Sequence, residues 1–296
     1  DSQALSQAAQ TDCSVGSPDL RQTYTQAFDA WISVSHLRFG PSETNNRAFA
    51  LAFWPDSRGK TPKTLRTMIQ TEDASVTPPS AFATSSIAVR GFYALEFLLY
   101  DAELSQFGEP SYRCQLVRAI TQDIAATSQA ILLEWQTSYA TQMRIAGGRY
   151  QSTAEVKQEL FKALNTGFQV TSDMRLGRPL GSFDTPRPNR AEARRSGRSL
   201  HHIKLSLQAL EPLAVALSGD NQQLAQDFQT SFAKAHPPNA RPHPPTPDSG
   251  PDHSHSSRDH TLPPVPTGPP RLSKQSLGPK PHSPPRAHSP RRQPTY

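Results

Sequence analysis

One carboxylate stands out in this chain because of the residues around it. Glu96 lies in the apolar run from residue 90 to residue 100, RGFYALEFLLY, which has the composition of a buried helix. An unpaired carboxylate is costly to bury, so Glu96 requires a cation, a proton or a metal as its partner. Tyr93 lies on the same helix face, and Gly91 leaves room for a close approach to the backbone. These residues predict a binding site, with a structural ion pair or hydrogen bond as the alternative.

Arginines gather in a second stretch, from residue 175 to residue 198. Seven arginines stand there against only two acidic residues. Several fall where a helix is expected to begin, which the helix dipole disfavours, so we expect an anionic partner. That partner is either Glu96, paired with Arg198 or Arg90, or a bound carboxylate, phosphate or chelate; a solvated charged face is the third interpretation. The candidate ligand-binding residues are Arg90, Gly91, Tyr93, Glu96, Arg175, Arg178, Arg194, Ser196 and Arg198, with Glu96 also the candidate metal ligand.

The elements that must position these residues are predicted to be helices. Apolar residues recur at helical spacing through the chain before residue 236, without the period-2 pattern of a strand, so we predict an all-α protein. A long helix is expected over residues 111–139, and Pro212 is expected to kink or interrupt a later helix. The signals for helix starts are Ser17-Pro18, Thr61-Pro62, Ser152-x-x-Glu155 and Asn189-x-x-Glu192.

The positive charge of the chain is concentrated after residue 235. Residues 236–296 contain 18 of the 29 prolines and carry a net charge of +5 out of the total of +6. This segment is predicted to be disordered, because it lacks the apolar residues that offset chain entropy. It is either a polyproline ligand or basic arm, or a non-native extension from a shifted reading frame. Because residues 1–235 are nearly neutral, we do not expect nucleic acid as a partner.

The two cysteines bear on the compartment of the protein. Cys13 and Cys114 do not have the spacing of a metal site, so they either pair or are both free. A disulfide, which we expect, requires an oxidising compartment. The chain begins at Asp1 without methionine, as a processed secreted protein would, and no apolar run is long enough to span a membrane. We therefore expect a periplasmic or cell-envelope protein secreted after removal of a signal peptide.

Five segments together resemble the imelysin family of bacterial cell-envelope proteins, also called imelysin peptidases and related to iron-uptake components. The resemblance covers roughly residues 15–235 and includes the glycine and glutamate of a Gly-x-His-x-x-Glu signature; Tyr93 stands where the signature has histidine. The segments are WISVSHLRFGP (31–41), AFWPD (52–56), RGFYALEFLLY (90–100), RLGRPLGSF (175–183) and RRSGRSL (194–200).

The resemblance implies two helical bundles related by approximate symmetry, with a site near their junction. We expect a disordered N-terminus over 1–15, a first bundle with the Gly-x-Tyr-x-x-Glu motif over 16–145, and a second, truncated bundle over 146–235, followed by the disordered tail over 236–296. The second bundle is expected to be incomplete because the proline-rich tail stands where further helices of the family would follow.

Three functions follow from the resemblance and the residues. The leading one is a cell-envelope protein that binds iron, another divalent metal or a small anionic ligand without covalent chemistry, with other envelope proteins as candidate partners. The first alternative is a metal-dependent, peptidase-like hydrolase in which Glu96 activates a metal-bound water. The second is a structural or interaction protein with a vestigial site. Tyr93 weakens both metal hypotheses, because tyrosine binds ferric iron only as phenolate, against an ordinary pKa near 10.

Overall fold

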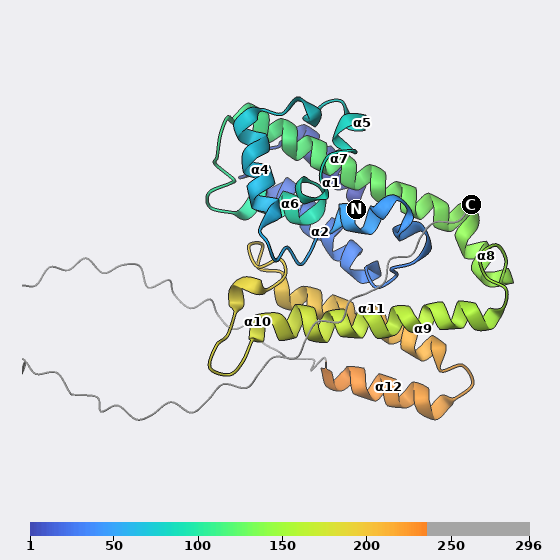
Figure 1. Ribbon diagram of the computed structural model, residues 1–296. Helices are drawn as coiled ribbons and strands as arrows, with labels where there is room; N and C mark the ends of the chain where they lie inside the picture. The colour runs from blue at the N-terminus through green and yellow to red at the C-terminus, as the bar shows by residue number, and fades with distance from the viewer. Residues whose placement is uncertain (236–296) are drawn as a thin grey trace, which may run out of the picture. The chain divides into compact units, whose positions relative to one another are not determined.

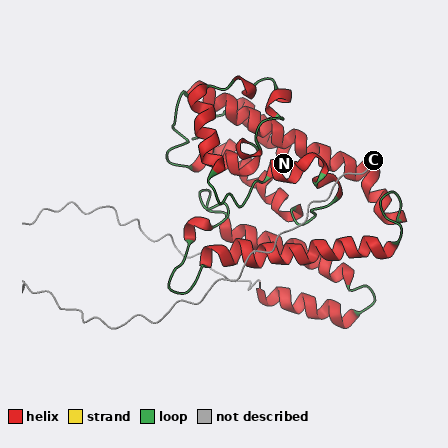
Figure 2. Ribbon diagram, in the orientation of Figure 1, coloured by secondary structure: helices red, strands yellow, loops and turns green. Residues whose placement is uncertain are grey.

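The structure is a computed structural model that describes residues 1–235. These residues form helices and loops without a β-strand, which confirms the all-α prediction (Figures 1 and 2). The tail predicted to be disordered, 236–296, lies outside the described residues. The α-helices are α1 (Ser2–Thr11), α2 (Pro18–Val34), α3 (Arg47–Leu51), α4 (Lys60–Thr71), α5 (Pro79–Phe82), α6 (Gly91–Tyr100), α7 (Pro110–Glu134), α8 (Ala140–Ile145), α9 (Thr153–Gln169), α10 (Arg178–Leu180), α11 (Ser199–Leu217) and α12 (Gln222–Ala235).

Local capping signals predicted two of the helix starts correctly. The Ser17 hydroxyl accepts a hydrogen bond from the Leu20 amide at the start of α2. The Ser152 hydroxyl accepts from the Glu155 amide at the start of α9. Both side chains satisfy amides that have no partner within their own helix.

Two other local predictions were wrong. Asn189-x-x-Glu192 does not open a helix, since α11 begins only at Ser199. Glu192 is instead a buried side chain that pairs with Arg175, so a tertiary contact overrides the local capping pattern. Pro212 does not interrupt α11, which continues to Leu217.

The predicted disorder of residues 1–15 was also wrong, because Ser2–Thr11 forms α1. This helix packs against α2 and α7 and buries Leu5 and Ala9 completely. In the structure Cys13, just after α1, forms a disulfide with Cys114 of α7. Alanines supply most of the buried face of α1. The sequence of this segment therefore has few large apolar residues, although one face of the helix packs against the rest of the protein.

The described residues form three hydrophobic cores, and two of them adjoin α11. The larger one is formed mainly by α1, α2, α4, α6 and α7, with the rings of Phe28 and Phe92 stacked at a centroid distance of 4.7 Å. The smaller one joins α9, α11 and α12 through Leu164, Leu210 and Phe232, and these three helices lie side by side in Figure 1. Since α11 contacts α2 as well as α9, residues from both parts of the chain meet along it. The approximate symmetry and the boundary at 145/146 stay predictions.

Gly91, the first residue of α6, has a positive φ of 74°. A Cβ atom there would lie 2.2 Å from the Leu51 carbonyl oxygen and 2.3 Å from that of Ala50. The approach that Gly91 permits is therefore that of the backbone at the end of α3.

Replacing Gly91 with alanine is expected to destabilise the fold more than the same change at Gly219. Gly219 also has a positive φ, but a Cβ there would meet nothing within 4 Å, so Gly219→Ala should cost about 1 kcal/mol of backbone strain. Gly91→Ala adds the displacement of packed backbone, about 1–3 kcal/mol more. Urea denaturation of both variants measures the difference; equal losses would mean that the backbone at Leu51 gives way freely.

Candidate functional site

Glu96 lies in the middle of α6 and is only 2 % exposed. Its Oε1 accepts two hydrogen bonds from Ser196, one from the backbone amide at 2.9 Å and one from the hydroxyl at 2.7 Å. Ser196 belongs to the loop that precedes α11. The two hydrogen bonds therefore hold the carboxylate of α6 against a segment of the chain 100 residues later.

The prediction that Arg198 or Arg90 pairs with Glu96 was wrong. The Arg90 guanidinium makes two hydrogen bonds to Asp123 of α7, at 2.9 and 2.7 Å, and Arg198 pairs with Asp29 of α2. Hydrogen bonds to a carboxylate from an amide and a hydroxyl are charge-assisted. At Oε1 they take the place of the cation that the sequence suggested for Glu96.

Tyr93, one turn before Glu96, is a buried hydrogen-bond donor. Its hydroxyl donates to Oε1 of Glu192. Burial, reinforced by the negative charge of Glu192, raises the pKa of Tyr93 well above its ordinary value. The phenol therefore stays neutral, which opposes the phenolate form that binding ferric iron would require.

Glu192 is the centre of a buried ionic network, which we define as Asp29, Tyr93, Arg175, Glu192 and His202. Arg175 Nε donates to Oε2 of Glu192 at 2.6 Å. His202 is fully buried, with Nδ1 3.4 Å from Glu192 Oε2 and Nε2 3.6 Å from Asp29 Oδ1. The network thus connects α2, α6, the loop before α11, and α11 itself.

Arg175 reaches this network from an unusual helical segment. The chain continues from α9 through a π-helix, Val170–Gly177, into α10. Wider helical turns of this kind often occur at functional sites. Besides Glu192, Arg175 donates through Nη1 to the Ser206 hydroxyl at 3.0 Å, so its guanidinium is fixed between two partners.

The network determines the charges of its buried members. Burial alone opposes ionisation of Glu192, but Arg175 and His202 outweigh it and lower the pKa of Glu192 to about 2. Burial likewise opposes a charged His202, but Asp29 and Glu192 outweigh it and raise the pKa of His202 above 6.5. At mildly acidic pH the network therefore holds a carboxylate on either side of an imidazolium.

Removing this imidazolium is expected to make stability depend differently on pH. Folding raises the pKa of His202. The contribution of its charge to the free energy of unfolding is therefore fully present below about pH 6.5 and is lost as the pH rises through the folded-state pKa. Wild type should exceed His202→Gln by about 1–3 kcal/mol at low pH, and the gap should shrink towards pH 9. Denaturation curves from about pH 5 to about pH 9 measure it.

His201→Gln is the matched control, because His201 precedes His202 and its side chain is 43 % exposed. Burial and then Arg198 lower the pKa of His201. The advantage of wild type over His201→Gln should therefore grow with pH, opposite to the His202 trend. A wild-type advantage over His202→Gln that is constant with pH would contradict the charged network.

A cavity of about 390 Å³, the arginine cavity, lies against Glu96. It is formed by the loop around residues 53–62, by α6 and by residues 178–195. Among the residues that the structure describes, Arg178, Arg190 and Arg194 form no ion pair. The charged lining residues are Asp56, Glu96, Arg178, Arg190, Arg194 and Arg195.

The other charged groups of the arginine cavity already have partners. Both Asp56 carboxylate oxygens accept backbone amides at the start of α4, from Lys60 at 2.8 Å and Thr61 at 2.7 Å. Arg195 pairs with Asp101 at 2.8 Å and lies over the Phe97 ring. The cavity thus presents unpaired positive charge around one buried carboxylate.

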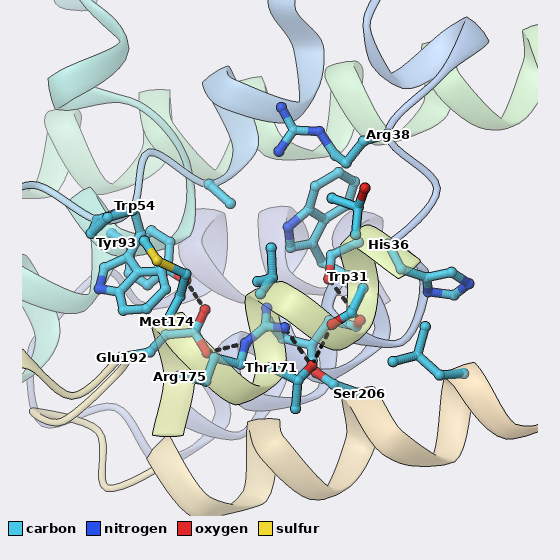
Figure 3. Close-up of a pocket in the computed structure, with 18 residues that line it drawn as sticks. Trp31, His36, Arg38, Trp54, Tyr93, Thr171, Met174, Arg175, Glu192 and Ser206 are labelled. Atoms are coloured by element: carbon cyan, nitrogen blue, oxygen red, sulfur yellow. Dashed lines mark hydrogen bonds and ion pairs between the residues drawn. The ribbon is translucent and has the colours of Figure 1, made fainter. Parts of the chain in front are cut away.

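A smaller inner cavity of about 120 Å³ lies on the other side of Tyr93. Figure 3 shows the Arg175 side chain extending between Glu192 and Ser206 along this cavity, near Trp31. Tyr93 and Trp54 line both cavities, with ring centroids 6.4 Å apart. His36 lies at the inner cavity, where burial and the charge of Arg175 lower its pKa to about 4 and keep it neutral at neutral pH.

A third hollow, the apolar groove, has a volume of about 440 Å³ and lies along α2 and α7. Its lining includes Trp31, Val34, Leu132 and Trp135 but no charged residue. Serines are its polar lining residues, but no charged group orients an ionic ligand there, so it is a weaker candidate for such a ligand than the other two cavities.

Comparison with known sequences identifies the family. The sequence model of the family described as Imelysin matches residues 1–238. The chain belongs to the imelysin family. A crystal structure of an imelysin-like protein from Psychrobacter arcticum 273-4 has the same fold, with a TM-score of 0.64 and 22 % sequence identity over 79 % of this chain and 74 % of that one. A search of curated proteins found no match.

In this imelysin, the residues predicted from sequence divide between the two cavities and the scaffold. Tyr93, Glu96, Arg178 and Arg194 line the arginine cavity, and Arg175 lines the inner cavity together with Tyr93. Ser196 holds Glu96. The other predicted residues do not line either cavity. Arg90 forms an ion pair with Asp123, Arg198 forms one with Asp29, and Gly91 lies against the backbone at the end of α3.

Three members of the ionic network, Asp29, Glu192 and His202, were not predicted. Glu192 was assigned to a helix cap, and no local pattern marks Asp29 or His202. The one available signal was that Glu192 is an acid isolated among seven arginines between 175 and 198.

The donor set around Glu96 does not fit a metal ion. Within residues 1–235, no group of three or more histidine, cysteine, aspartate or glutamate side chains is arranged to hold one. Glu96 has one oxygen engaged by Ser196, and the other charged groups without partners at the cavity are arginines. Arginines repel a cation and supply no acceptor.

Imelysins are associated with the bacterial cell envelope. No helix of this imelysin within residues 1–235 is long and apolar enough to cross a membrane.

Proposed function

We propose that this imelysin is a cell-envelope binding protein, and that its arginine cavity binds a small ligand with an anionic group. The observation that carries the proposal is the set of three arginines, Arg178, Arg190 and Arg194, that line one cavity without an ion-pair partner among the described residues. Guanidinium groups bind carboxylates and phosphates through two parallel hydrogen bonds. No covalent step is required.

The position of Arg178 supports this proposal most strongly. It follows the π-helix directly and is half-buried, with its guanidinium 5.7 Å from the centroid of the Trp54 ring. Stacking on an aromatic face holds the cation in place without neutralising it. Arg178 is therefore positioned to meet an anion in the cavity.

Metal acquisition and metal-dependent hydrolysis are less well supported. Both require ligands near Glu96, and the neutral Tyr93 phenol and the arginines do not supply them. The disulfide between Cys13 and Cys114 favours an oxidising compartment, which agrees with a periplasmic location.

Calorimetric titration with succinate, inorganic phosphate, Zn²⁺ and Mn²⁺ tests the proposal. One of the two anions should bind with a single site per chain, and the double variant Arg178→Met/Arg194→Met should weaken this binding at least tenfold, as expected for the loss of about 1.5–3 kcal/mol per charged hydrogen bond. Arg187→Met is the control, since Arg187 lies in the exposed segment between Arg178 and Arg194 but does not line the cavity.

The opposite result would be tight, stoichiometric metal uptake that Glu96→Gln abolishes, with neither anion bound. That outcome would mean that the cavity is a metal site and not an anion site. Anion binding that is unchanged in the double variant would place the ligand elsewhere.

A further inference from the structure

The arginine cavity combines both signs of charge, and we infer that its ligand is a zwitterion of the amino-acid type, with an ammonium group directed to Glu96 and a carboxylate directed to the arginines. The inference rests on the proposed function and narrows the class of ligand that the same site binds.

The first step concerns the two oxygens of Glu96, which are used unequally. Oε1 accepts two hydrogen bonds from Ser196, at 2.9 and 2.7 Å, whereas Oε2 accepts none within residues 1–235. Oε2 is also not among the buried polar atoms that are sealed without a partner. Glu96 is 2 % exposed and lines the arginine cavity, so the cavity is the side from which Oε2 is reached.

The second step is that a carboxylate oxygen only accepts hydrogen bonds. A charged acceptor in such a place is stabilised by a donor, and most of all by a cationic donor. The arginines that lack ion pairs are separate from it, since Glu96 forms no ion pair with any described residue. Glu96 therefore offers a position for a cationic group that belongs to the ligand.

The third step compares ligand classes by charge. A dianion such as succinate would gain the arginines, but the negative charge of Glu96 would weaken its binding. A free cation would gain Glu96 but would meet the arginines. Like charges repel each other strongly at short range in a site that is partly shielded from water. A molecule with both charges on neighbouring carbons avoids both repulsions.

The size and the walls of the cavity agree with this class. A volume of about 390 Å³ lies within the range of small-molecule sites. Phe53, Trp54, Pro55 and Phe97 provide apolar walls for a side chain.

A matched set of three probes tests the inference on the wild-type protein. L-leucine carries both charges, 4-methylpentanoate lacks only the ammonium group, and 3-methylbutylamine lacks only the carboxylate. In calorimetric titrations, L-leucine should bind at least tenfold more tightly than either analogue. Because only ligands are compared, the result does not depend on the folding of a variant.

Glu96→Gln supplies the second arm. This substitution should weaken the binding of L-leucine at least tenfold, while 4-methylpentanoate should bind as tightly as to wild type or more tightly. The preference for L-leucine over 4-methylpentanoate should therefore disappear. Arg187→Met should preserve the preference.

The inference is overturned if 4-methylpentanoate binds as tightly as L-leucine, or if none of the three probes binds. The proposed function survives either result as long as succinate or phosphate still binds in the arginine-dependent manner described above. It fails if no anionic probe binds the wild-type protein, or if anion binding is unchanged in the Arg178→Met/Arg194→Met variant.

Discussion

Replacing Arg175 with methionine is expected to lower the free energy of unfolding by about 3–5 kcal/mol, because it leaves Glu192 buried without its main counter-charge. Arg175 is 7 % exposed and Glu192 is 1 % exposed, and their side chains meet at 2.6 Å. The Ser206 hydroxyl loses a donor in the same change. Urea denaturation with the disulfide intact measures the loss.

Arg187→Met is again the control, because Arg187 is exposed and forms no ion pair among residues 1–235. Its stability should lie within about 0.5 kcal/mol of wild type. The double variant Arg175→Met/Glu192→Gln should recover part of the loss, since it removes both members of the pair. A loss of less than about 1 kcal/mol in Arg175→Met would show that His202 and Tyr93 suffice for Glu192.

Replacing both cysteines with serine is expected to give the second large loss. Cys13 and Cys114 are 101 residues apart, and in the chain-entropy model a cross-link of that span contributes about 4–5 kcal/mol. The loss should first appear in α1, which the disulfide ties to α7. Denaturation midpoints give its size, and hydrogen exchange of the α1 amides locates it.

Reduced wild type is the control for the serine side chains and should match the double variant. Equal midpoints for the oxidised protein and the double variant would show that packing of Leu5 and Ala9 alone holds α1 in place.

Local signals in the sequence were sufficient for helices whose ends are fixed locally. Ser17 and Ser152 cap α2 and α9 through neighbouring amides, so a short window of sequence contains both the cap and its partner. α1 was missed because small alanines, rather than large apolar residues, form most of its buried face.

The candidate site was only partly predictable, because its contacts join distant segments. The sequence identified Glu96 as a buried carboxylate, but its partner, Ser196, lies 100 residues away. Glu192 fits a capping box as well as a buried acid, and only the fold brings Tyr93, 99 residues away, to its carboxylate. The helical periodicity of apolar residues indicates which face of a helix is buried. It does not indicate which other part of the chain packs against that face.

The indole N–H resonances of the three tryptophans test the location of the ligand most directly. Trp54 borders the arginine and inner cavities, Trp31 the inner cavity and the apolar groove, and Trp135 only the apolar groove. Titration of ¹⁵N-labelled protein with L-leucine or succinate should shift the Trp54 resonance alone. A shift of Trp135, or saturation binding that leaves Trp54 unmoved, would contradict a ligand site in the arginine cavity.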